Sequence, residues 1–388
     1  MTEGGTDTEW NTTAKFRDIG AWYHVVAQLD NTQSTFANRC KLFVNGVEYA
    51  TSSSGSSTQS SATAIIGNGT TSVGNSYYGG AYQGNWFGGY MAQVAMIQGV
   101  IHAPTDFGEF DEDSGIWKPI DITGLTYASY SFLLDFEDSS NLGNNASGSG
   151  LADLTEAGLA ATDQSTDTCT NNSCTMNPLN MPISNQPTFS EGNLKTVTSS
   201  SGSGRFGGTS TFGVTQGKWY VEAKATVGST YSRNSIGVSY NPAEMARNNS
   251  DNTLTDTSYA WGWDSSGGDV YHDSSVVVNY ATYTTGDICQ IFLDLDNHKL
   301  YYGKNGTLQS STGISLDTGQ TYFIAQIDRT GGSDTSTFEF NFGSPIYAIS
   351  SSNTDGEYGN FEYSTTITGD GASKTFKALN SANLAEHG

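Results

Sequence analysis

The fold is decided by the stretch Gly217-Lys218-Trp219-Tyr220-Val221-Glu222-Ala223, which has the pattern of an alternating β-strand that begins at a tryptophan. Similar short runs recur outward from it in both halves of the chain, for example from Trp22 to Leu29, and clusters of Gly, Asn, Asp and Ser separate them. Helical periodicity is almost absent. The sequence therefore predicts an all-β protein with two similar units in series.

Two Asn-Gly pairs indicate hairpin turns, one in each half of the chain. Lys41-Leu42-Phe43-Val44 leads into Asn45-Gly46 and Val47-Glu48-Tyr49, and Lys299-Leu300-Tyr301-Tyr302 leads into Gly303-Lys304-Asn305-Gly306. Both central residues of a type I′ turn have φ above zero, which Asn and Gly adopt readily. We therefore predict an antiparallel hairpin at each pair.

The composition limits the classes of function. Among 388 residues, 16 Lys and Arg stand against 39 Asp and Glu, which gives a formal net charge of -23. Because phosphate binding needs clustered basic residues, we expect no nucleic-acid partner.

No apolar run approaches the roughly 20 residues that span a bilayer, and the first residues show no export signal, so we expect no membrane insertion. Metal, nucleophile-elbow and phosphate-loop motifs are absent from the sequence, so we expect no cofactor.

Four segments are predicted from changes in composition. Residues 1–142 and 194–347 form the two β domains, residues 143–193 form a polar linker, and residues 348–388 form a C-terminal tail. Within the linker, Leu151 to Ala160 is a candidate short helix. Near the end, Phe376-Lys377-Ala378-Leu379-Asn380 has the composition of a tail that docks on another surface.

The first domain resembles the laminin-G-like, concanavalin-A-like sandwich. The resemblance rests on three segments: Ala21-Trp22-Tyr23-His24-Val25-Val26, Lys41-Leu42-Phe43-Val44-Asn45-Gly46 and Phe87-Gly88-Gly89-Tyr90-Met91-Ala92-Gln93-Val94.

From Lys195 to about Tyr347 the chain resembles a SPRY domain, which implies a bent antiparallel sandwich whose loops bind another protein. The matching residues are Gly217-Lys218-Trp219-Tyr220-Val221-Glu222, Ile236-Gly237-Val238, Trp261-Gly262-Trp263, Phe292-Leu293-Asp294-Leu295-Asp296 and Lys304-Asn305-Gly306. The two resemblances together predict two antiparallel, jelly-roll-like β-sandwich domains in tandem.

A narrower resemblance is to virion proteins of marine bacteriophages. It rests on the tandem order and on Phe107-Gly108-Glu109, Gly115-Ile116-Trp117-Lys118-Pro119 and Phe132-Leu133-Leu134-Asp135-Phe136. Those relatives carry Pro and a small residue where this chain has Cys169 and Cys174. A disulfide that closes this short loop is our hypothesis, worth about 2 kcal/mol by loop entropy, and two unrelated free thiols are the alternative.

Two acidic groups invite a chemical interpretation. Glu109, Asp111 and Asp113 alternate along one run, as the carboxylates of laminarinase-type glycoside hydrolases do, but the run ends in a turn and also fits a solvated acidic loop. Asp294 and Asp296 are weak candidates for cation ligands, because hard cations prefer clustered carboxylates. A plain turn after a strand is the alternative there.

Aromatic residues supply the candidate contacts with a ligand or partner. Tyr77, Tyr78, Tyr82 and Trp86 lie in a Gly-rich loop, where we expect exposure, and Tyr271 lies near Trp261, which matches a buried SPRY position. Aromatic faces stack on the C–H patches of sugars, so these residues predict a surface for a glycan or a neighbouring subunit.

Three functions remain open at this stage. We expect a non-enzymatic bacteriophage virion protein, part of a tail fibre or head fibre, whose loops bind a host-surface glycan or protein and which forms a homo-oligomer among other virion subunits. A capsid or tail decoration protein with a purely structural role is the second, and a secreted glycan-active enzyme is the third. Fold resemblance alone does not separate these functions.

Overall fold

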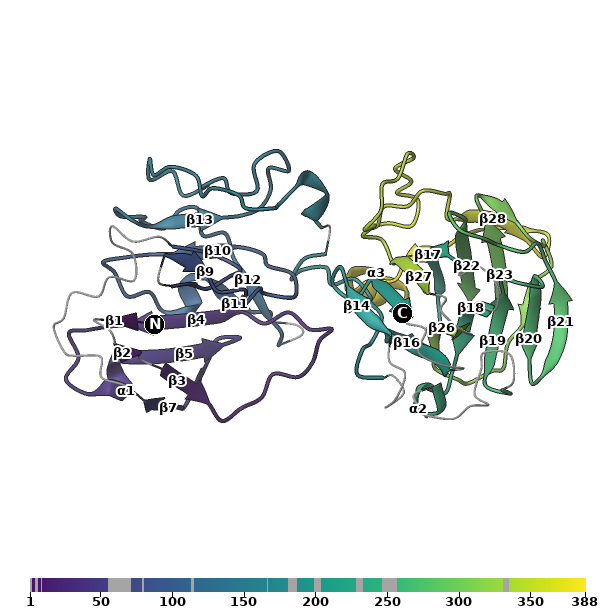
Figure 1. The fold of residues 1–388 in the computed structure, drawn as a ribbon, viewed down its shortest axis with the longest axis horizontal. Coiled ribbons are helices and arrows are strands. Elements are labelled where there is room, and N and C mark those ends of the chain that lie inside the picture. The colour runs from purple at the N-terminus through teal and green to yellow at the C-terminus, as the bar shows by residue number, and fades with distance from the viewer. Residues whose placement is uncertain are drawn as a thin grey trace. The chain divides into compact units, whose positions relative to one another are not determined.

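The protein forms two compact units, Met1–Gln164 and Ser165–Gly388, in a computed structural model (Figure 1). The structure describes residues 2–3, 6–7, 9–54, 71–78, 80–112, 115–165, 167–180, 187–198, 204–227, 233–245, 257–330 and 335–388. The predicted linker of residues 143–193 is therefore wrong as a separate segment, because its first part belongs to unit 1 and its remainder to unit 2. The candidate helix from Leu151 to Ala160 is not formed either.

Unit 1 is built from short antiparallel strands. β4 (Val25–Leu29), β5 (Cys40–Val44) and β6 (Val47–Tyr49) form a three-stranded sheet. The other pairs are β1 (Thr2–Glu3) with β2 (Thr6–Asp7), β3 (Glu9–Thr12) with β7 (Thr51–Ser54), β8 (Tyr77–Tyr78) with β9 (Ala81–Tyr82), β10 (Val94–Met96) with β13 (Phe132–Leu134), and β11 (Gly108–Phe110) with β12 (Trp117–Pro119). Its helical turns are α1 (Phe36–Arg39), η1 (Pro104–Asp106) and η2 (Ala161–Asp163).

The predicted hairpin of unit 1 is confirmed, and a tryptophan packs on its turn. Asn45 and Gly46 have φ of 49° and 77°, as a type I′ turn requires. The ring of Trp117 lies so close to Gly46 and Gly108 that a Cβ added there would be 2.3 and 2.6 Å from ring atoms. The indole Nε1–H donates to His24 Nδ1 at 3.0 Å, which fixes that nitrogen as an acceptor. Both glycines therefore allow the close approach of the Trp117 ring, and Gly46 is needed for the turn as well.

Unit 2 consists of two sheets with one core between them, and all of its described strand pairs are antiparallel except β30 with β17. In one sheet the order is β14-β15-β27-β17-β22-β23-β24, with β25 beside β23 and β30 beside β17, and in the other it is β16-β26-β18-β19-β20-β21. The strands of the first sheet are β14 (Thr188–Ser190), β15 (Lys195–Thr198), β17 (Lys218–Thr226), β22 (Ile288–Asp294), β23 (Lys299–Lys304), β24 (Thr307–Leu308), β25 (Ile314–Ser315), β27 (Ser336–Asn341) and β30 (Lys377–Ala378). Those of the second are β16 (Gly204–Val214), β18 (Arg233–Ser239), β19 (Ala260–Asp264), β20 (Asp269–His272), β21 (Ser275–Asn279) and β26 (Tyr322–Thr330). Outside these sheets lie the hairpin β28 (Thr366–Gly369) with β29 (Ala372–Thr375) and the helices α2 (Pro242–Met245) and α3 (Ser381–His387).

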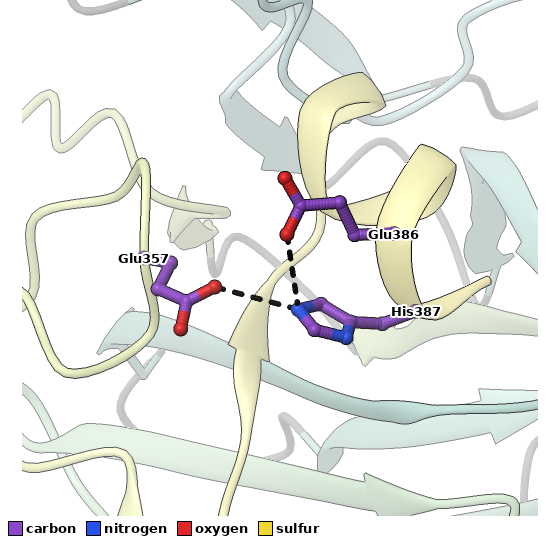
Figure 2. Close-up of side chains that lie close together, drawn as sticks. All are labelled: Glu357, Glu386 and His387. Carbon is purple, nitrogen blue, oxygen red and sulfur yellow. Dashed lines mark hydrogen bonds and ion pairs between the residues drawn. The ribbon is translucent and has the colours of Figure 1, made fainter.

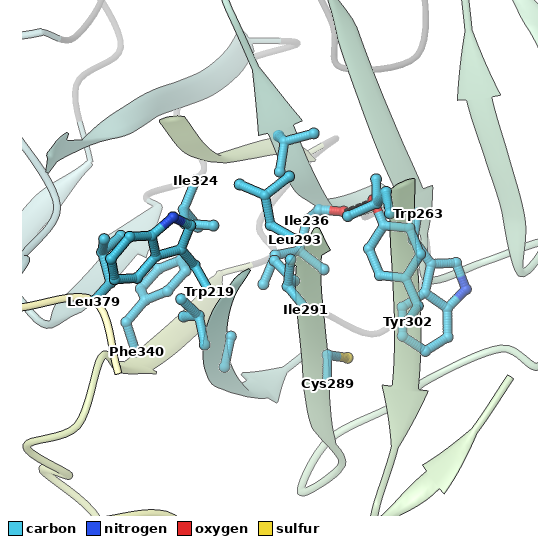
Figure 3. Packing of buried hydrophobic residues seen from close by; sticks show 14 of the residues in the cluster. Trp219, Ile236, Trp263, Cys289, Ile291, Leu293, Tyr302, Ile324, Phe340 and Leu379 are labelled. Carbon is cyan, nitrogen blue, oxygen red and sulfur yellow. Dashed lines mark hydrogen bonds between the residues drawn. The ribbon is translucent and has the colours of Figure 1, made fainter. Parts of the chain in front are cut away.

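Residues 218–223 of the tryptophan-led stretch lie in the central strand β17. Trp219 and Val221 enter the core between the sheets, where Figure 3 shows Trp219 near Phe340 and Leu379. Tyr220 is also fully buried, but it belongs to a second cluster on the opposite face of the strand. Successive side chains of a strand point to opposite faces, so Trp219 and Tyr220 are both buried only if another part of the chain covers the outer face of β17.

The C-terminal segment covers that outer face. Phe361, Phe376 and Ala378 pack against Tyr220 and Phe292, and β30 pairs with β17 in parallel register. The tail that we predicted over residues 348–388 is thus an integral part of unit 2, and the docking composition of residues 376–380 serves this unit's own sheet. No helix among the described residues is long and apolar enough to cross a membrane.

Candidate functional site

The Gly-rich loop of unit 1 forms a hairpin that presents aromatic rings. β8 and β9 pair through Tyr77 with Tyr82, and the rings of these two residues make an edge contact at 5.1 Å. The ring of Trp86 then stacks on Tyr82 with 6.5 Å between centroids and 26° between planes. Backbone hydrogen bonds from Gln83 N to Ser76 O (2.9 Å) and from Phe87 N to Gly74 O (2.8 Å) close the loop. We call residues 74–87 the aromatic hairpin.

Exposure at this hairpin agrees with the prediction for two of its four residues. The exposed fractions are 52% for Tyr82 and 67% for Trp86, and the neighbouring Phe87 adds 55%. Tyr77 is half-buried, and the side chain of Tyr78 lies outside the described residues. Large aromatic rings that are ordered by one another and open to water are suited to stacking on a flat, partly apolar ligand.

Tyr271 belongs to unit 2 and is not part of the aromatic hairpin. It is half-buried on β20, and its hydroxyl donates to Asp269 Oδ2 at 3.2 Å. Beside it, Trp261 is buried, as its resemblance to a SPRY core position implied, and its ring stacks on His272 at 4.1 Å. Tyr271 therefore supports a strand and is not part of an open aromatic surface.

The acidic run lies on a salt-bridged hairpin. Glu109 is opposite Lys118 in the β11–β12 pair, and the Lys118 ammonium lies 3.4 Å from Glu109 Oε1 and 3.1 Å from Asp111 Oδ2. The two carboxylates raise the pKa of Lys118, the hydrogen bond with Asp111 having the largest effect. Asp113 lies outside the described residues. A lysine shared between two acids is the arrangement of a surface ion-pair cluster.

The predicted disulfide is wrong, since Cys169 and Cys174 are both free. Cys169 is exposed in a tight turn between Thr168 and Asn171, whereas Cys174 points into the core, with its Sγ 3.6 Å from Thr211 Oγ1. Burial raises the pKa of Cys174 to about 11. The turn directs the two side chains to different environments, so sequence proximity did not bring the sulfurs together.

The two weak cation candidates each have a lysine as counter-ion. Asp294 is fully buried and accepts from Lys374 Nζ at 2.9 Å, and that ammonium also donates to Tyr301 Oη at 2.8 Å. Asp296 pairs with Lys218 and accepts from Gly217 N at 2.8 Å. Lysine ammonium groups occupy the positions that a cation would need.

A buried glutamate holds the C-terminal segment, and the sequence analysis missed it. Glu222, on the outer face of β17, is fully buried, and each of its carboxylate oxygens accepts from one backbone N–H, that of Tyr363 at 2.8 Å or that of Glu362 at 3.1 Å. Side-chain donors are Tyr220 Oη (2.9 Å), Asn341 Nδ2 (3.2 Å) and Tyr347 Oη (3.3 Å). Burial raises the pKa of Glu222, and these hydrogen bonds offset part of the rise. The only signal in the sequence was an acidic residue between the apolar residues Val221 and Ala223.

Comparison with known families matches one model to each unit. Residues 1–104 match the concanavalin A-like lectin/glucanases superfamily, and residues 218–343 match the SPRY domain. A concanavalin A-like domain and a SPRY domain therefore stand in tandem. The aromatic hairpin lies in the concanavalin A-like domain, and Glu222 lies in the SPRY domain.

Among solved structures, the SPRY domain of human HERC1 is similar to part of the chain, with 17% sequence identity and a TM-score of 0.35. The match covers 42% of this chain and 96% of that one. No curated protein sequence matches the chain.

Proposed function

We propose that this chain is a non-enzymatic recognition protein that binds a surface glycan through the aromatic hairpin of its concanavalin A-like domain. The observation that carries the proposal is the pair of stacked, exposed rings of Tyr82 and Trp86. Sugar rings present flat C–H faces that match such a platform, and the polar side chains around it, such as Asn85 and Gln83, offer hydrogen bonds to hydroxyl groups.

The mechanism is weak binding multiplied by copy number. An open platform of a few rings gives low affinity for one sugar, because little of the ligand is buried. Many copies on one particle turn such contacts into firm attachment. The tandem order of the domains and the resemblance to virion proteins support placing the chain on a bacteriophage particle, as part of a tail or head fibre that binds a host-surface glycan.

Glycan-array binding of wild type, Trp86→Ala and Tyr82→Ala tests the proposal. Each substitution should weaken binding about two- to twelvefold, as expected for loss of an aromatic contact of about 0.5–1.5 kcal/mol. Tyr130→Ala is the matched control, because Tyr130 is 46% exposed in the same unit outside the hairpin. Binding that survives both hairpin substitutions, or that is lost equally in the control, would refute this site.

The quaternary part of the proposal is a homo-oligomer within the virion. Light scattering of the purified chain in high-salt buffer measures it, and a stable oligomer is the expected result. A chain that stays monomeric at all concentrations would still be able to bind a glycan as a single copy, but this result would contradict the fibre role. The alternative of a purely structural decoration protein was supported by the expectation that the Phe376 segment docks on a neighbouring subunit. This segment is instead buried on the sheet of its own unit, so that support is lost.

A further inference from the structure

Three potential metal ligands converge beside the last helix of unit 2. Figure 2 shows the carboxylates of Glu357 and Glu386 directed at the same ring nitrogen of His387. The distances to His387 Nε2 are 3.4 Å from Glu357 Oε2 and 3.8 Å from Glu386 Oε2, and the three ligand atoms all lie within 4.8 Å of one another. Glu357 comes from the loop before β28, whereas the other two come from α3.

These separations suit ligands of one metal ion better than a direct hydrogen bond. Charge-assisted N–H···O contacts are about 2.7–2.9 Å long, well below both distances. Two ligands that are each about 2.0–2.1 Å from a tetrahedral zinc ion stand about 3.3–3.4 Å apart. The triangle therefore needs only small side-chain rotations to close around an ion, and its exposed side leaves room for water as a further ligand.

The surroundings hold the ligands in place. Lys377 pairs with the other oxygen of Glu357, Oε1, and so leaves Oε2 facing the imidazole. Asn383, one turn before His387 on α3, is fully buried, and its Nδ2 donates to the backbone oxygens of Gly356 (3.1 Å) and Glu357 (3.0 Å). Asn380 caps the start of α3 by accepting from Asn383 N at 2.9 Å. Loop and helix are thus fixed to each other independently of the three ligands, as a metal site requires of its supporting residues.

We propose that Glu357, Glu386 and His387 form a binding site for a first-row divalent transition metal, of which Zn²⁺ is the natural occupant. One imidazole and two carboxylates suit zinc and its neighbours, whereas Ca²⁺ and Mg²⁺ prefer all-oxygen sites. The bound ion ties α3 to the loop that covers the outer face of the nine-stranded sheet. Its role is to stabilise that cover, and the proposal is independent of glycan binding.

Cobalt titration of the full chain tests the site, after removal of any affinity tag and treatment with a chelator. Visible absorption of Co²⁺ reports nitrogen and oxygen ligation directly, Zn²⁺ should displace it, and Zn²⁺ should raise the unfolding temperature of unit 2. His387→Gln and Glu386→Gln should each weaken binding by at least about tenfold. Because Glu386 is exposed, its substitution tests the site without disturbing the core.

His102→Gln is the matched control, since His102 contacts one carboxylate, Asp106 at 3.0 Å, and should bind metal as the wild type does. Equal Co²⁺ binding by wild type and His387→Gln would overturn the proposal. So would no binding at millimolar Co²⁺ or Zn²⁺, or a thermal shift that Ca²⁺ and Mg²⁺ reproduce, since that would reflect general screening of the net charge of -23.

Discussion

Replacing Glu222 by glutamine should loosen the C-terminal segment from unit 2. The carboxylate receives five hydrogen bonds and donates none, and each oxygen serves one backbone N–H. A glutamine has one acceptor oxygen and one NH₂ group, so in either orientation the N–H of Glu362 or that of Tyr363 faces another donor. Tyrosine hydroxyls can rotate to accept, but a backbone N–H cannot.

The magnitude follows from the number of donors left without a partner. The less costly orientation leaves the N–H of Tyr363 unsatisfied, while Tyr220 turns to accept, so Glu222→Gln should lower the free energy of unfolding by about 1–3 kcal/mol. Glu222→Ala leaves both backbone N–H groups unsatisfied and should lower it by about 2–6 kcal/mol. Neither variant has to bury a charged carboxylate on folding, and this saving offsets part of both losses in the free energy of unfolding. We therefore expect results toward the lower ends of these ranges.

Urea unfolding and hydrogen exchange at pH 8 measure the effect. We expect faster exchange at the amides of Glu362 and Tyr363 in both variants, with the alanine variant more affected. Glu339→Gln is the matched control, because Glu339 makes a half-exposed ion pair with Lys195 at 3.0 Å, worth under about 1 kcal/mol. If Glu222→Gln is as stable as the wild type within about 0.5 kcal/mol and its amides stay protected, the argument from donor count is refuted.

Three further predictions concern packing and pH. Phe376→Ala should lower the free energy of unfolding of unit 2 by about 3–5 kcal/mol, because the ring is fully buried against Phe292 and Tyr301. Chemical denaturation measures this loss, and a loss of less than about 1 kcal/mol would contradict the prediction. Gly46→Ala should destabilise unit 1, since φ is 77° and the new Cβ would meet a ring at 2.3 Å, and a melting temperature equal to that of the wild type would contradict this. Burial lowers the pKa of His24 from 6.5, so the unfolded state binds more protons and unit 1 should lose stability as pH falls below about 6.5. Thermal melts of wild type and His24→Gln between pH 5 and 8 measure this loss, and the melting temperatures of the two proteins should converge at acid pH. A difference in melting temperature that stays constant over this pH range would exclude the effect.

Local signals in the sequence predicted the strands and turns but not their partners. The turn at Asn45-Gly46 was predicted from turn chemistry, and the strand that contains Trp219 was predicted from alternation. Position 46 also requires glycine because the ring of Trp117 packs against it. That contact joins segments far apart in the chain, and a local sequence pattern does not encode it. Cys169 and Cys174 show the opposite error, because closeness in sequence did not imply that the side chains face each other.

The candidate sites divide in the same way. Exposure of Tyr82 and Trp86 was predictable, because a Gly-rich loop rarely enters a core. The triangle of Glu357, Glu386 and His387 was not, since it forms only when α3 packs beside the loop before β28.

The parallel pairing of β30 with β17 sets an order of events during synthesis. Tyr220 and Phe292 leave the ribosome long before Phe376 and Ala378 do, so the outer face of the sheet is apolar and uncovered while the segment that carries Phe376 is still being made. Unit 1 has all of its residues available by then and can fold first. A chain that stops before residue 376 would therefore expose this apolar sheet face, and ribosome stalling shortly before residue 376 should produce aggregates of unit 2 with a folded unit 1 attached.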